Sequence, residues 1–101
     1  MNKMRRKELV DLVKELRAFQ DKDDIYTAIN TLENIRDDEE NYYDNIPENL
    51  QSGQRAYDSE EAIDKMNDAL DLLNDAYDAD NTDEIKNMVA DAINKINEAR
   101  Y

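Results

Sequence analysis

Carboxylates are the abundant residues of this chain that could do chemistry. The 101 residues include 26 Asp or Glu, 13 Lys or Arg, one Gly, and no His or Cys. Without His and Cys the chain lacks the commonest general base, the thiol nucleophile and the usual zinc ligands. A single glycine cannot build a phosphate-cradling loop. The remaining chemistry is that of carboxylates, which bind cations and basic surfaces.

The first set of carboxylates follows spacings of four, three and four, which place its members on one face of a helix. It consists of Glu33, Asp37, Glu40 and Asp44. Some all-helical nucleotide pyrophosphatases hold magnesium with such residues, so a magnesium-dependent pyrophosphohydrolase is one interpretation. This face lies roughly 120° from the apolar stripe of the same helix, whereas a catalytic site in a bundle needs inward-pointing carboxylates. We therefore expect a non-enzymatic protein with no catalytic residue, metal or cofactor.

A longer row of carboxylates follows spacings of three, four, three, four and three. We call these six residues the carboxylate ridge: Glu61, Asp64, Asp68, Asp71, Asp75 and Asp78. The segment from Asp58 to Glu84 holds 11 acidic residues and one basic residue, Lys65. Like charges along one helix face destabilise the helix by roughly 0.2–0.5 kcal/mol per step. Selection for stability alone therefore does not favour this ridge.

The spacing of these charges suggests two interpretations. The ridge carries one charge per ~5 Å, and a second row alongside it, from Glu33 to Asp44, would give one charge per ~2.5 Å. Duplex DNA carries one charge per ~1.7 Å. The protein could therefore mimic nucleic acid and block a basic nucleic-acid-binding surface. Alternatively, this is the solvated face of a structural or adaptor protein, and its acidity confers only solubility.

Three tyrosines flank the expected turn between the second and third helices and are candidate partner-binding residues. They are Tyr42, Tyr43 and Tyr57. Tyrosine is favoured at binding hot spots because it buries a large area at small entropic cost. Adjacent helical residues point about 100° apart. We therefore expect one of Tyr42 and Tyr43 to close the core and the other to be exposed.

The net charge of −13 is unevenly spread. Residues 1–20 hold six basic and three acidic groups (+3), and residues 21–101 hold seven basic and 23 acidic groups (−16). An acidic body repels nucleic acid and anionic membranes. We expect a cytoplasmic protein whose partner has a basic surface, such as a nucleic-acid-binding host defence protein. The basic start should pack against the acidic body, in the same chain or in a homodimer.

Four amphipathic helices must position these residues, because apolar side chains repeat at intervals of three and four. The sequence predicts a single all-α domain, an elongated antiparallel hairpin or bundle. It comprises a basic N-terminal helix over 2–19, a central hairpin over 24–79 and a C-terminal helix over 82–100. The expected core residues are Leu9, Leu12, Val13, Leu16, Phe19, Ile25, Ala28, Ile29, Leu32, Ile35, Ala62, Ile63, Met66, Ala69, Leu70, Leu73, Ala76, Tyr77, Ile85, Met88, Val89, Ala92, Ile93, Ile96 and Ala99.

The helix ends carry recognisable signals. Pro47 disfavours helical geometry in the residue before it, so the second helix should end near Asn45. Asp58 and Glu61 fit a capping box for the third helix, which should begin between residues 52 and 59. N-cap side chains accept hydrogen bonds from the first N–H groups of a helix. The expected N-cap of the second helix is Asp23 or Asp24, and that of the last helix is Asn81 or Thr82.

The turn and its flanks resemble a recurrent segment of small acidic helical proteins from low-GC Gram-positive bacteria and their phages. The resemblance lies in Tyr43-Asp44-Asn45-Ile46-Pro47-Glu48-Asn49-Leu50-Gln51-Ser52, followed by Glu60-Glu61-Ala62-Ile63-Asp64, and covers roughly residues 32–79. Gly53 and Gln54 depart from the pairs usual at this turn, which leaves the start of the third helix open. The resemblance implies a helical hairpin and no mechanism. The resemblance also implies an origin in such bacteria or phages. Combined with the acidic helical surface, it leads us to expect an interaction protein that acts as an anti-defence or regulatory inhibitor made by a phage or mobile element.

Overall fold

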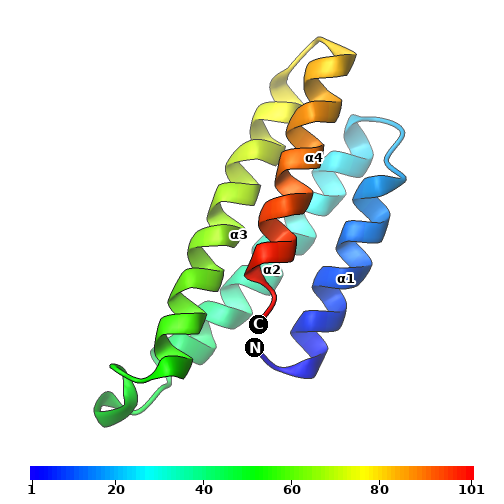
Figure 1. Ribbon diagram of the computed structural model, residues 1–101. Helices are drawn as coiled ribbons and strands as arrows, with labels where there is room; N and C mark the ends of the chain where they lie inside the picture. Colours follow the sequence, from blue (N-terminus) through cyan, green and yellow to red (C-terminus); the bar gives the residue numbers. More distant parts are fainter.

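The computed structural model describes residues 1–101 and contains four α-helices, one short 3-10 helix and no strand. The helices are α1 (Lys3–Arg17), α2 (Lys22–Asp44), α3 (Gln54–Asp78) and α4 (Thr82–Ala99), with the 3-10 helix η1 (Glu48–Leu50) between α2 and α3. They pack as an antiparallel bundle that measures 48 × 20 × 17 Å (Figure 1). The prediction of an elongated all-α fold is confirmed.

The four helices form a closed ring around one core. α2 packs against α1 and α3, and α4 packs against α3 and α1. α2 and α3 have 23 and 25 residues, whereas α1 and α4 have 15 and 18. The α2–α3 hairpin therefore extends beyond the two chain ends, which lie together at that end of the bundle (Figure 1). None of the helices combines the length and the apolar character needed to cross a bilayer.

The core is one cluster of 20 buried residues to which all four helices contribute. Most of the predicted apolar stripes lie in this cluster, because helical periodicity places them on inward faces. Phe19, Ile63, Ile85 and Met88 are only half-buried. Tyr77, predicted to be a core residue, is 38% exposed. The ring of Tyr77 instead packs on the surface against Tyr26 of α2, with the ring centroids 5.9 Å apart.

Buried alanines repeat at seven-residue spacing on α3 and on α4, and we call these five residues the alanine seam. Ala62, Ala69 and Ala76 repeat every seven residues along α3, and Ala92 and Ala99 are seven residues apart on α4. All five are buried. Small side chains allow two helix axes to approach closely. Accordingly, α3 and α4 share the most extensive contact of any helix pair.

Side-chain caps define the start of three helices. The side-chain oxygen of Asn2 accepts from the backbone N–H of Arg5 at 2.8 Å, and that of Asn81 accepts from Glu84 at 3.0 Å. The cap of α4 is therefore Asn81, one of the two expected residues. The cap of α2 is Asp21, which accepts from the N–H of Asp24 at 3.1 Å, so the expected caps Asp23 and Asp24 are wrong.

The predicted capping box of α3 is also wrong. α3 already begins at Gln54, after an extended Gly53 with φ −82° and ψ 173°, so Asp58 and Glu61 lie inside the helix. The Asp58 carboxylate accepts from the side-chain amide of Gln54 at 2.7 Å instead of capping a helix end. The end of α2 agrees with the prediction, since Asn45 is its C-cap.

Candidate functional site

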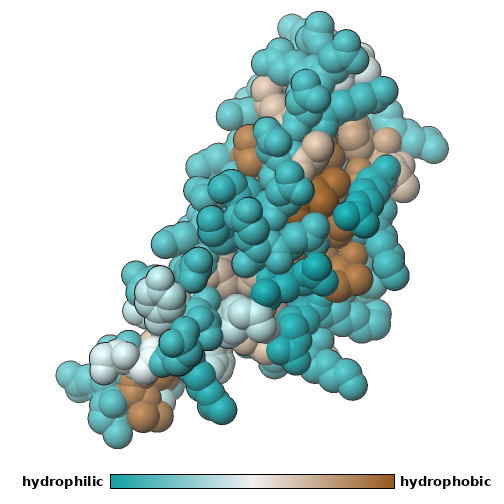
Figure 2. Space-filling model, viewed as in Figure 1, coloured by the Kyte–Doolittle hydropathy of each residue, from teal (hydrophilic) through white to brown (hydrophobic).

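The carboxylate ridge lies along the outer face of α3. All six of its side chains are exposed. The opposite face of α3 carries the buried residues, including Met66, Leu70 and Leu73. The core positions and the ridge positions are offset by about half a turn of the helix. When the core positions pack against the other helices, the ridge positions therefore face solvent. Figure 2 shows the mostly hydrophilic surface that results over α3.

The carboxylates of α2 lie beside the ridge, but they differ in solvent exposure and in their ion pairs. Asp37 and Asp44 are exposed, whereas Glu33 and Glu40 are half-buried. Arg36 pairs with Asp37 at 3.1 Å and with Glu40 at 3.8 Å. Its Nη1 also donates to the side-chain oxygen of Asn67 on α3 at 3.1 Å. Arg36 thus partly neutralises the middle of the α2 row.

The α2 row and the ridge approach each other at a shallow groove between α2 and α3, where Asp64 represents the ridge and Glu60 lies beside it. Glu40 and Asp44 line one wall and Glu60 and Asp64 line the other. Tyr43 lies among them. We call this arrangement of the ridge and the α2 row the α2–α3 carboxylate face. The sequence predicted both rows, and the antiparallel packing of α2 on α3 places them on adjacent surfaces.

Lys65, the one basic residue among the acidic residues of α3, pairs across the bundle. Its ammonium group lies 3.1 Å from a carboxylate oxygen of Glu98 on α4. The hydrogen bond raises the pKa of Lys65 and lowers the pKa of Glu98. The ion-pair partner of Lys65 is therefore on α4 rather than on the ridge.

The three candidate tyrosines lie on different surfaces. Tyr42 and Tyr43 are both half-buried, so the expectation of one core ring and one exposed ring is wrong. Tyr42 faces α1, where the Arg5 guanidinium lies 5.4 Å from its ring centroid. Tyr43 lines the groove between α2 and α3. Tyr57, which is 63% exposed, lies beside Glu61 and Asp64. Tyr43 and Tyr57 therefore border the carboxylate face, and Tyr42 does not.

A buried carboxylate, Glu39, organises the end of the bundle where the chain ends meet. Its Oε1 accepts from Arg5 Nε at 2.9 Å. Its Oε2 accepts from the hydroxyls of Ser59 and Tyr101, both at 2.6 Å. Burial and the hydrogen bond to Glu39 raise the pKa of the Tyr101 phenol. We had not predicted this cluster, although Glu39 follows Ile35 by four residues and so continues the buried face of α2.

We predicted that the basic start of the chain packs against the acidic body, and one ion pair, that of Arg5, agrees with this prediction. Arg5 pairs with Glu39 of α2, as expected of a basic segment packed against the acidic body. Lys7 pairs instead with Asp11 of its own helix, at 2.8 Å. That contact raises the pKa of Lys7 and lowers the pKa of Asp11. The α1–body contact therefore depends on one buried ion pair, on the hydrogen bond from Arg6 to the main-chain oxygen of Tyr101 and on apolar packing.

The carboxylates lie in rows and do not converge. No group of three or more Asp or Glu side chains is placed to hold a metal ion. In particular, Glu33, Asp37, Glu40 and Asp44 follow the outside of α2 over about three turns. The geometry is that of an extended charged surface.

Protein-family models, curated protein sequences and solved structures contain no match to this chain.

Proposed function

We propose that this chain binds the basic, nucleic-acid-binding surface of another protein through its α2–α3 carboxylate face. The observation that supports this proposal is the juxtaposition of two carboxylate rows, which meet where Glu40 and Asp44 face Glu60 and Asp64. Two rows at about 1.5 Å rise per residue present one carboxylate per ~2.5 Å, before the partial neutralisation by Arg36, against one charge per ~1.7 Å in duplex DNA. A cleft that accepts a phosphate backbone would meet a similar density of negative charge.

The energetics favour a surface held ready for a cationic partner. Neighbouring carboxylates on the ridge repel one another, at about 0.2–0.5 kcal/mol per step in an isolated helix. Lys or Arg side chains of a partner would relieve that repulsion on binding. Charge complementarity of this kind also accelerates association, and its effect declines as salt is added. Tyr43 and Tyr57 border the face and supply aromatic area for close contacts.

The setting we propose is the cytoplasm of a bacterial host. The resemblance of the hairpin segment to small acidic proteins of Gram-positive bacteria and their phages supports an origin in a phage or mobile element. Occupation of a basic groove would make the chain an inhibitor. Its target would be a nucleic-acid-binding protein of host defence or regulation. In this proposal the chain acts by occupying a groove and needs no cofactor and no catalytic residue.

The test uses a ridge variant, in which Asp64, Asp68, Asp71 and Asp75 are each replaced by Asn. A matched variant removes four exposed carboxylates outside the ridge, by Glu15→Gln, Asp38→Asn, Glu48→Gln and Asp91→Asn. Each protein is immobilised and exposed to the fraction of a bacterial lysate that binds duplex DNA. Retained protein is then measured at low salt, at high salt and after addition of free duplex DNA.

The proposal predicts that wild type and matched variant retain the same proteins, and that salt or free duplex DNA releases them. The ridge variant should retain at least tenfold less. Equal retention by the ridge variant and wild type would refute the proposal. Equal loss in both variants would also refute it, because total charge rather than the ridge would then account for binding.

A further inference from the structure

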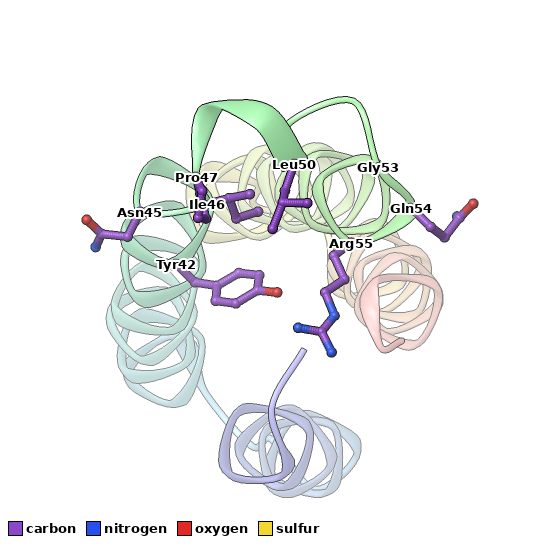
Figure 3. Close-up of a pocket in the computed structure, with 8 residues that line it drawn as sticks. All are labelled: Tyr42, Asn45, Ile46, Pro47, Leu50, Gly53, Gln54 and Arg55. Carbon is purple, nitrogen blue, oxygen red and sulfur yellow. The ribbon is translucent and has the colours of Figure 1, made fainter.

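A second concave surface lies at the end of the bundle, under the overhanging α2–α3 hairpin. It consists of two adjoining cavities of about 660 and 640 Å³, and both are lined by Tyr42 and Arg55. The first continues along the apolar side chains of Ile46, Pro47 and Leu50. In Figure 3, Tyr42 and Arg55 extend toward each other across the open end of the four-helix ring, and Leu50 points into the same space.

The second cavity gathers positive charge in an otherwise acidic protein. Three of the six arginines of the chain line it, namely Arg5, Arg6 and Arg55. Asp58 is the carboxylate that lines it, and this group already accepts from Gln54. The buried Glu39 pairs with Arg5. The arginines around the cavity therefore outnumber the carboxylates by three to two, whereas the chain as a whole has a net charge of −13.

Much of the hydrogen-bonding capacity of these arginines is unused. Arg5 donates to Glu39 through Nε, and neither of its Nη atoms has a protein acceptor. Arg6 uses Nη1 alone, which donates to two main-chain oxygens. The Arg55 side chain makes no hydrogen bond and no ion pair within the chain, although carboxylates surround the hairpin. A guanidinium fork with free N–H groups is suited to a planar carboxylate or a phosphate.

We propose that this end cavity binds a small organic anion, in which an apolar body carries a terminal carboxylate or phosphate. The oxyanion would lie between Arg55 and the free Nη groups of Arg5. The apolar body would pack against Tyr42, Ile46 and Leu50. The cavity volumes fall within the roughly 300–1,000 Å³ of typical ligand pockets, which combine apolar walls with a few polar groups. This site is separate from the α2–α3 carboxylate face and does not depend on its function.

The probes are four eight-carbon compounds that differ only in the head group: octanoate, octyl phosphate, octanol and octylamine. Binding is measured by calorimetry and by the NMR shifts of Tyr42, Leu50 and Arg55. The proposal predicts that octanoate or octyl phosphate binds at least tenfold more tightly than octanol, and that octylamine binds no better than octanol. Comparison of the two anions shows whether the arginines select a carboxylate or a phosphate.

Two arginine variants separate the site from general charge effects. Arg55→Gln should weaken binding of the preferred anion about tenfold, which equals about 1.4 kcal/mol. Arg17→Gln removes the same charge from an exposed position on α1 outside the cavity and should leave binding unchanged. Because Arg55 is exposed and its side chain makes no hydrogen bond or ion pair within the chain, its replacement tests binding rather than folding. The ridge variant should bind the anion at least as tightly as wild type.

Three results would overturn the proposal. The first is equal affinity for octanol and both anions, which would indicate apolar binding alone. The second is equal affinity of the Arg55→Gln and Arg17→Gln proteins for the anion. The third is a set of NMR shifts that avoids Tyr42 and Leu50. None of these results would bear on retention of DNA-binding proteins by the carboxylate face.

Discussion

The phenol of Tyr101 donates a 2.6 Å hydrogen bond to Oε2 of Glu39, a residue 62 positions earlier in the chain. Ser59 and Arg5 occupy the other acceptor positions of the same carboxylate. Glu39 is completely buried, and every buried side-chain N or O atom of the protein has a hydrogen-bond partner. A buried charge is tolerated when its lone pairs are satisfied in this way. The contact ties the last residue of the chain to the middle of the bundle.

Loss of the Glu39 carboxylate is predicted to destabilise the fold strongly. Glu39→Ala would leave the Arg5 guanidinium without its acid and two hydroxyls without their acceptor. Breaking a buried pair typically costs about 3–5 kcal/mol. Urea unfolding followed by circular dichroism measures this cost.

The adjacent residue gives the control for that experiment. Glu40 is half-buried, and its ion pair with Arg36 is long, at 3.8 Å. Such a pair contributes at most about 1 kcal/mol. If Glu39→Ala and Glu40→Ala shift the urea midpoint equally, the Glu39 cluster does not contribute as we describe.

The fold should lose stability at alkaline pH through Tyr101. The pKa of this phenol is raised in the folded protein above its ordinary value of 10.0, by burial first and then by the bond to Glu39. Above pH 10 the unfolded chain therefore releases a proton that the folded chain retains, and the stability declines as pH rises through the folded pKa. Tyr101→Phe should remove this part of the decline. Equal alkaline slopes of unfolding free energy in the two proteins would contradict the prediction.

The ridge variant should be more stable than wild type at low salt. Replacement of Asp64, Asp68, Asp71 and Asp75 by Asn relieves all five repulsive steps of the ridge, worth together about 1–2.5 kcal/mol. Added salt screens the repulsion in wild type, so the difference should shrink as ionic strength rises. Thermal unfolding at two salt concentrations measures both effects. A ridge variant less stable than wild type at low salt would show that these carboxylates make contacts that the structure lacks.

The start of α4 should depend on one side chain. Asn81 caps the N–H of Glu84, and removal of such a cap costs about 1 kcal/mol. Asn81→Ala is therefore predicted to destabilise the protein by that amount in urea unfolding. Asn94, exposed in the interior of the same helix, is the matched position. Asn94→Ala should be neutral or slightly stabilising, because Ala has the higher helix propensity.

The helices could be predicted from the sequence because their signals are local. Leu9, Leu12 and Leu16 repeat at the helical period, and Pro47 forces a break wherever it stands. The ridge was predictable for the same reason, since residues opposite a buried stripe must face solvent. The capping box of Asp58 and Glu61 was a local signal too. It failed because nothing near Gly53 prevents the helix from starting five residues earlier.

The features that we did not predict depend on contacts between distant segments. Burial of Glu39 requires Arg5, Ser59 and Tyr101 to arrive from three other parts of the chain. The end cavity depends on the overhang of the α2–α3 hairpin past α1 and α4, which follows from the relative positions of four helices. Side-chain periodicity specifies which face of a helix is buried. It does not specify how far one helix extends beyond its neighbours.

The alanine seam between α3 and α4 has a consequence for the order of folding. Only residues 79–81 separate these helices, so their contacts form with little loss of loop-closure entropy. Contacts between residues close in sequence accelerate folding. The α3–α4 hairpin is therefore expected to form first and to serve as the surface on which α2 assembles. α1 reaches α4 only across most of the chain, so the Glu39 cluster, which needs Arg5 and Tyr101 together, should be the last part of the protein to become ordered.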